Sequence, residues 1–179
     1  MSAHNPDFNE EHIPLAYLIT FRCYGTWLHG DERGSTDRYH NQYGAAFIPN
    51  NERWRRYNQS LLKHPPVELD AQRREEVETA VHETCDKRGW LLRAVNVRTN
   101  HAHIVVTAPC KPELALAAFK ANATRQMREA GCWRYSYSPW ADNGSRRYLW
   151  TLRHVERAID YVINGQGDEL PDFDNDAEQ

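Results

Sequence analysis

Hydrophobic and polar residues alternate along residues 15–24, and this period of two predicts a β-strand with one apolar face. The apolar face comprises Leu15, Tyr17, Ile19, Phe21 and Cys23. The opposite face holds Thr20, Arg22 and Tyr24.

Later segments of the chain predict the partners of this strand. Asp70 is a suitable N-cap for a helix to about Arg88, and Gly89 ends it. Residues 90–98 form a second strand, and a turn at Thr99-Asn100 returns the chain antiparallel along 100–106. Further along, the pattern predicts a helix over 112–129, loop and strand over 133–150, and a helix over 152–164 that Thr151 caps.

This order, β-α-β-β-α-β-α, predicts an α+β fold with a ferredoxin-like antiparallel sheet, helices on one face and the other face left open. The domain spans residues 12–166, with an irregular insertion at about 25–68 and an acidic, disordered tail over 167–179. Within the insertion, residues 52–62 are able to form one short basic helix.

The returning strand reads Asn100-His101-Ala102-His103-Ile104-Val105-Val106. Side chains alternate on a strand, so His101 and His103 share one face, roughly 7 Å apart along the chain. Ala102 and Ile104 point to the other face, into an apolar layer. Two imidazoles on one face are able to hold a divalent metal. The alternative is two unrelated histidines, each hydrogen-bonded to its neighbours.

The charge is distributed unevenly. The chain has 22 basic and 25 acidic residues, but nine of the acids lie in residues 1–11 and 168–179, where no Lys or Arg occurs. The body at 12–167 therefore carries a formal charge of +6. A basic body with acidic ends is compatible with a polyanionic partner. Four scattered cysteines and no apolar run of membrane-spanning length predict a reduced cytoplasmic protein without membrane contact.

The last predicted helix places Val155, Ala158, Ile159 and Val162 in one buried stripe, with Tyr161 at its edge. Asn164 lies about one turn beyond Tyr161, and Gly165 ends the helix just before Gln166. A tyrosine with an amide one turn later is able to reach a common metal-bound phosphate. The alternative is a boundary tyrosine and a C-cap asparagine.

Three motifs, in order, resemble a known family. The histidine strand resembles the His-hydrophobic-His motif of HUH endonucleases. Residues 119–125 resemble the Leu-Lys-x-x-x-Ser/Thr-Arg stretch of their single-tyrosine branch, and residues 157–166 resemble its nucleophile helix. That branch includes the insertion-sequence and REP-associated tyrosine transposases. The resemblance covers residues 13–24 and 69–166, approximately, and it implies the HUH nuclease fold.

The resemblance implies a metal-dependent enzyme that nicks and joins single-stranded DNA containing hairpins, and that is cytoplasmic and associated with the nucleoid. His101 and His103 would hold Mg²⁺ or Mn²⁺, and Tyr161 would form a 5′-phosphotyrosine and a free 3′-hydroxyl. Lys120 and Arg125 would hold the DNA backbone, with four further candidates from the basic body: Arg22, Arg98, Arg146 and Arg147. Tyr161 would serve its own histidines or those of a second subunit in a homodimer.

The third metal ligand departs from the family pattern. The usual position for Gln or Asn, four residues after the tyrosine, holds Gly165. Asn164 is better placed if the helix continues, whereas Gln166 is favoured if Gly165 forms a left-handed cap. Both stay candidates, with Gln166 slightly preferred.

Two other classes of protein use similar histidine motifs, but the sequence lacks the further residues that each class needs. A cupin-type metal oxygenase needs a Glu a few residues after His103 and a further His, but Thr107 and Lys111 stand there. A two-histidine phosphoesterase needs two His-x-Thr/Ser motifs, and the chain has none. The remaining rival is a domesticated, non-catalytic binder of structured single-stranded DNA or RNA.

Overall fold

The computed structural model describes residues 13–29 and 50–165. Four strands form one antiparallel sheet in the order β2-β3-β1-β4. Their bounds are β1 Ala16–Arg22, β2 Leu91–Val97, β3 His101–Thr107 and β4 Ser145–Leu149. The helices are α1 Glu52–Ser60, α2 Ala71–Arg88, α3 Pro112–Glu129 and α4 Leu152–Asn164. The predicted α+β class and the order of elements are confirmed.

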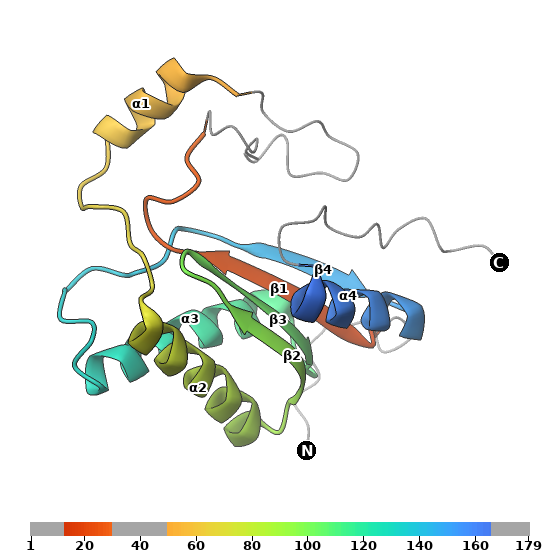
Figure 1. Cartoon of the computed structure of the whole chain (residues 1–179). Coiled ribbons are helices and arrows are strands. Elements are labelled where there is room, and N and C mark those ends of the chain that lie inside the picture. The colour runs from red at the N-terminus through yellow and green to blue at the C-terminus, as the bar shows by residue number, and fades with distance from the viewer. Residues whose placement is uncertain (1–12, 30–49, 166–179) are drawn as a thin grey trace.

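Helices α2 and α3 cover one face of the sheet (Figure 1). Ile19, Phe21 and Ile104 pack there against Phe119 of α3 and Val81 of α2. Asp70 accepts a hydrogen bond from the Arg73 amide at the start of α2, and Gly89 ends the helix at φ 65°. The left-handed φ explains why glycine stands at this C-cap.

The expectation that the other face stays open needs correction, because α4 lies on it. Val155, Ala158 and Val162 of α4 pack against Leu18 and Val105. Strand residues alternate between faces, so the strands that feed the α2–α3 core also present apolar side chains to the opposite face. The amphipathic stripe of α4 is buried against those side chains, and this places α4 on the same face as the histidines.

The predicted insertion at 25–68 contains α1, which stands away from the sheet in Figure 1. None of its nine residues is buried. Trp54 of α1 stacks on His29, with ring centroids 5.4 Å apart, and Asn58 donates to the His29 carbonyl. Residues 30–49 of the insertion, and the predicted tail at 167–179, lie outside the described residues.

Candidate active site

His101 and His103 lie on β3, next to the central strand β1. Arg22 of β1 pairs with His101, and Thr20 pairs with His103. The two imidazole rings are 4.7 Å apart between centroids, as the same-face spacing predicts. His101 is half-buried and His103 is 6% exposed. The strand therefore holds two imidazoles side by side on the face that α4 partly covers.

Each imidazole has a hydrogen-bond partner at Nδ1. The Asn100 side-chain oxygen lies 2.6 Å from His101 Nδ1, and Thr20 Oγ1 lies 2.7 Å from His103 Nδ1. An amide oxygen only accepts, so His101 donates from Nδ1, and Nε2 is the ring nitrogen that would face a metal. This arrangement is typical of metal-ligating histidines, whose second nitrogen is oriented by an outer partner.

The surroundings of His103 keep its ring neutral. Burial first, and then the nearby His101, Arg22 and Arg98, together lower the pKa of His103 from 6.5 to about 3. A histidine must be unprotonated to bind a metal. The two arginines that disfavour the imidazolium also place positive charge beside the site, which suits an anionic substrate.

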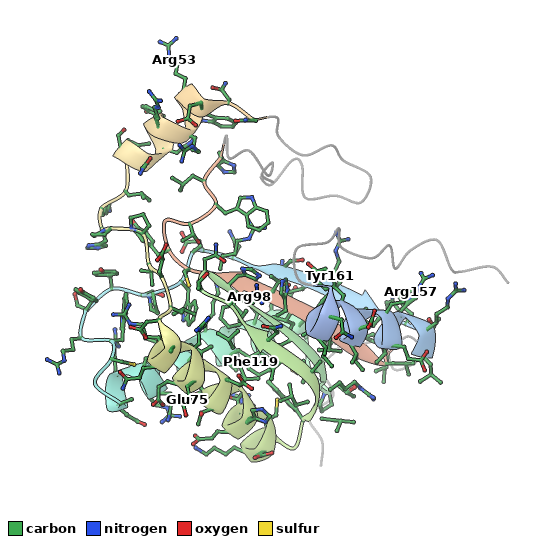
Figure 2. The ribbon with its side chains drawn as sticks, in the orientation of Figure 1. Arg53, Glu75, Arg98, Phe119, Arg157 and Tyr161 are labelled. Atoms are coloured by element: carbon green, nitrogen blue, oxygen red, sulfur yellow. The ribbon has the colours of Figure 1, made fainter. Side chains whose placement is uncertain are left out.

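Helix α4 brings Tyr161 to the histidines. The rings of Tyr161 and His103 are 5.4 Å apart between centroids, at 75° to one another. Asn96 of β2, the cross-strand partner of His103, donates to the Val162 carbonyl at 2.9 Å. This bond satisfies a carbonyl in the last turn of α4 and fixes the end that carries Tyr161. Figure 2 shows Tyr161 on α4 and Arg98 beyond the end of β2.

Among the tyrosines that the structure describes, Tyr161 alone has a ring contact with a histidine of the β3 motif. Tyr17 is buried, and its hydroxyl donates to the Cys110 carbonyl. Tyr24, Tyr135 and Tyr137 contact other aromatic rings in a separate group. Tyr39 and Tyr43 lie outside the described residues.

Part of the chain that carries this arrangement matches a known protein family. The sequence model of the family "Transposase IS200 like" matches residues 66–143, a segment that includes both motif histidines. The resemblance to single-tyrosine transposases is confirmed. The IS200-like segment ends before α4, so the match does not include Tyr161.

Two solved structures also align with the chain. One is a REP-associated tyrosine transposase bound to a REP hairpin, with a TM-score of 0.47 and 11% identity over 87% of this chain and 69% of that one. The other is a proposed transposase from Deinococcus radiodurans R1, with a TM-score of 0.44 and 14% identity over 94% of this chain and all of that one. No curated protein matches the chain.

The third metal ligand is not apparent from a cluster of metal-binding side chains. Within residues 13–29 and 50–165, no group of three His, Cys, Asp or Glu side chains is placed to hold a metal. Asn164 is exposed, and its side-chain nitrogen donates to Asp160 at 2.7 Å, which leaves its amide oxygen as an acceptor. His101 and His103 thus fit a divalent ion as two nitrogen ligands, with an amide oxygen to be added.

The cap that favoured Gln166 is not formed. Gly165 has φ −94° rather than a left-handed value, because its amide still donates to the Tyr161 carbonyl in a helical turn. A Cβ at this position would lie 3.1 Å from the Tyr161 Cα and 3.2 Å from its ring. The close approach of Tyr161 explains the glycine. Gln166 itself lies outside the described residues.

The predicted DNA-contacting residues divide between the two faces of the sheet. Arg147 lies on the histidine side of the sheet, because it pairs with Leu18. Arg22 and Arg98 lie there too, because both are close enough to His103 to lower its pKa. Arg146 lies on the α3 side, where it pairs with Glu113 at 3.4 Å. Arg125 of α3 pairs with Glu129 at 2.8 Å. The six residues therefore do not form one surface.

Lys120 has a structural contact that the sequence did not suggest. Its Nζ donates to the Ala141 carbonyl at 2.8 Å and to the Asn143 carbonyl, and burial lowers its pKa. It thus holds the loop before β4 against α3. Its predicted contact with the DNA backbone stays a prediction.

Replacing Lys120 by alanine should destabilise the fold, because two carbonyls lose a charged donor. Hydrogen bonds to charged groups contribute about 1.5–3 kcal/mol, so urea unfolding should show a loss of that order. The same variant also tests the DNA contact, since a lost phosphate contact lowers the salt slope of binding by about one charge. Arg125→Ala, whose side chain is 43% exposed, is the control for stability. Unchanged unfolding of Lys120→Ala would contradict the structural role.

Sequence reasoning missed the residues that orient the site. Thr20 and Asn100 bond the two imidazoles, and Asn96 fastens α4. The parity of β1 already placed Thr20 on the polar face, but its partner depends on cross-strand register. It also missed Trp27, a bulky residue at φ 59° whose ring lies 3.6 Å below the Arg22 guanidinium.

Proposed function

We propose that this protein is a metal-dependent endonuclease and strand transferase of single-stranded DNA, with Tyr161 as its nucleophile. The observation that carries the proposal is the contact between Tyr161 and His103 within a transposase-like chain. Two imidazoles beside a half-buried phenol bring the two components of tyrosine-mediated strand cleavage to one place. The exposed, positively charged Arg98 suits the approach of a phosphate.

In the proposed reaction, the Tyr161 oxygen attacks the scissile phosphorus. A bond from that oxygen to phosphorus forms, and the bond from phosphorus to the 3′-oxygen breaks. The phenol proton passes to water, and the departing oxygen takes up a proton to become a 3′-hydroxyl. The 5′-phosphate stays on Tyr161, so attack by another 3′-hydroxyl is able to reverse the step and join a new strand.

His101 and His103 would hold Mg²⁺ or Mn²⁺, with Asn164 or Gln166 as the amide ligand. A divalent ion held there draws charge from the phosphate oxygens during attack. Asn100 and Thr20 orient the two rings, and the burial of His103 limits the rotation of its own ring. Asn96 holds the end of α4, which sets the approach of Tyr161 to the same phosphate.

Tyr161 and both histidines belong to one chain in this structure. We therefore propose that the tyrosine serves its own histidines and that cleavage does not require a homodimer. The family resemblance supports a hairpin-containing single strand as the substrate. Within the described residues no helix is both long and apolar enough to cross a bilayer.

A covalent-capture experiment tests the proposed function. The wild-type protein is incubated with a labelled, hairpin-bearing single-stranded oligonucleotide and Mn²⁺, and then resolved under denaturing conditions. We expect a protein–DNA adduct that survives denaturant and is absent when EDTA is added. A fully paired duplex of the same sequence is the control. DNA binding without any adduct would instead support the non-catalytic binder and contradict the proposal.

A further inference from the structure

A group of aromatic rings lies at one end of the sheet, outside the site described above. It is assembled from the end of β1, the connection between α1 and α2, and the loop after α3. We call it the aromatic column, and it consists of Tyr24, His64, Tyr137, Tyr135 and Trp133. The column joins three segments that are far apart in sequence, at residues 24, 64 and 133–137, so only the fold brings these segments together.

The rings of the column contact one another in succession. His64 and Tyr137 stack face to face, with centroids 3.7 Å apart and planes at 4°. Tyr135 stacks on Tyr137 at 5.1 Å and 29°, and Trp133 meets both tyrosines edge-on. Tyr24 completes the group, 6.0 Å from His64. Only Trp133, at 2% exposed, belongs fully to the core.

The outer rings of the column remain accessible. Tyr135 is 53% exposed, and Tyr24, His64 and Tyr137 are half-buried. The backbone beneath them is firmly held, because Trp133 donates to the Tyr137 carbonyl and the Tyr24 carbonyl accepts from Val67. A stack of aromatic rings on a fixed backbone offers a preformed surface to another flat ring.

The column begins next to the histidine strand. The Cys23 amide donates to the Asn100 carbonyl at 2.8 Å, so Tyr24 follows a residue bonded directly beside His101. From there the Tyr24 amide donates to the Pro139 carbonyl, which leads to the loop that carries Tyr135 and Tyr137. Tyr24 and Tyr137 pack against the α2–α3 core, so the column adjoins that core at the end of the sheet where His101 lies.

Basic side chains lie near the column, with Asp70 paired to one of them, Arg73, at 3.8 Å. Arg128 donates to the Tyr135 and Ser136 carbonyls, and the Arg73 guanidinium lies 5.5 Å from the Trp133 ring. Lys63 directly precedes His64, Arg134 directly precedes Tyr135, and both basic side chains are exposed. Proteins that bind single-stranded nucleic acid combine aromatic stacking with cationic side chains in this way.

We propose that the aromatic column stacks unpaired bases of the single-stranded DNA that extends from the His101–His103–Tyr161 site. The inference rests on the proposed function for the identity of the strand, and it assigns a second contact surface to that strand. Because every base has a flat face, this contact adds affinity with little dependence on sequence. It therefore favours substrates with an unpaired extension over those that end at the hairpin.

Tyr135→Ala tests the column, because this exposed side chain is removable without opening the core. Binding is measured by fluorescence anisotropy with Mn²⁺ and two labelled oligonucleotides, a blunt hairpin and the same hairpin with an unpaired thymidine extension. Both the 5′ and the 3′ extension are tried. Stacking contributes about 1–3 kcal/mol per base, so we expect the extended substrate to bind about 5- to 150-fold more weakly to the variant. The blunt hairpin should bind equally well.

Two further variants give the controls. Tyr135→Phe keeps the ring and should bind the extended substrate within about twofold of the wild type, since the π-face is retained. Tyr148→Ala removes a tyrosine that is 42% exposed and also stacked, on Trp150, but away from the column. It should leave the affinity for both substrates unchanged.

An extended substrate bound equally by Tyr135→Ala and the wild type would overturn the column inference. This outcome is separate from the failure of the proposed function, which is judged by the covalent adduct on Tyr161. An adduct with no effect of Tyr135→Ala would retain the enzyme and reject the column. Loss of affinity without any adduct would retain the column and reject the enzyme. Crosslinking by 5-iodouracil in the extension, mapped to Tyr135 or a neighbouring ring, is the independent measurement.

Discussion

Replacing Tyr161 by phenylalanine should abolish the covalent protein–DNA adduct and leave DNA binding in place. The variant keeps the ring that packs 5.4 Å from His103 and against the core beneath α4. It loses only the hydroxyl oxygen, which is the proposed nucleophile. Removing a nucleophile typically lowers turnover by several orders of magnitude, so adduct formation should fall by on the order of 10³ or more.

The measurement is the denaturing-gel assay with the hairpin oligonucleotide and Mn²⁺, together with anisotropy for binding. Tyr148→Phe, a half-exposed tyrosine on β4, is the matched control and should form the adduct at the wild-type rate. Peptide mapping of the wild-type adduct should place the DNA on Tyr161. An adduct that persists in Tyr161→Phe, or that maps to Tyr24 or Tyr137, would reject the assignment.

Replacing His101 and His103 together by alanine should remove Mn²⁺ binding and cleavage. Loss of an outer-shell partner alone costs about 10- to 100-fold in metal affinity, and loss of both ligands should cost more. Isothermal titration calorimetry measures this directly. His82→Ala, which removes an exposed histidine from α2, is the matched control and should bind Mn²⁺ like the wild type.

The double variant carries a structural cost because His103 is nearly buried and bonded to Thr20. The variant His101→Ala, which changes only the half-buried ring, therefore separates metal binding from stability. It should lose Mn²⁺ affinity while unfolding in urea close to the wild type. Unchanged Mn²⁺ affinity in a folded double variant would show that the metal binds elsewhere.

The sequence by itself determined the secondary structure and the shared face of the histidines. Alternation in β1 and β3 fixes which side chains point together, because the period of a strand is two. The caps of α2 and α4 were equally local, since Asp70 and Thr151 each accept from an amide three residues later. The stripe of α4, with Tyr161 at its edge, followed from helical periodicity.

The tertiary structure decided where these elements meet. Helix α4 has one apolar stripe, but nothing local specifies which face of the sheet it covers. The choice depends on Leu18 and Val105, two side chains on strands distant in sequence that present an apolar surface beside His103. The packing of α3 on the opposite face puts Lys120 and Arg125 behind the sheet, although the family resemblance had placed both on the DNA backbone.

The orienting contacts were likewise decided by register rather than by motif. Thr20 reaches His103 because β1 and β3 pair antiparallel at that residue, and Asn96 reaches Val162 because α4 crosses β2 there. A shift of one residue in either pairing would turn these side chains to the opposite face. Local periodicity thus determines which chemical groups share a face in the candidate site. Long-range packing determines the distances between these groups and their hydrogen-bond partners.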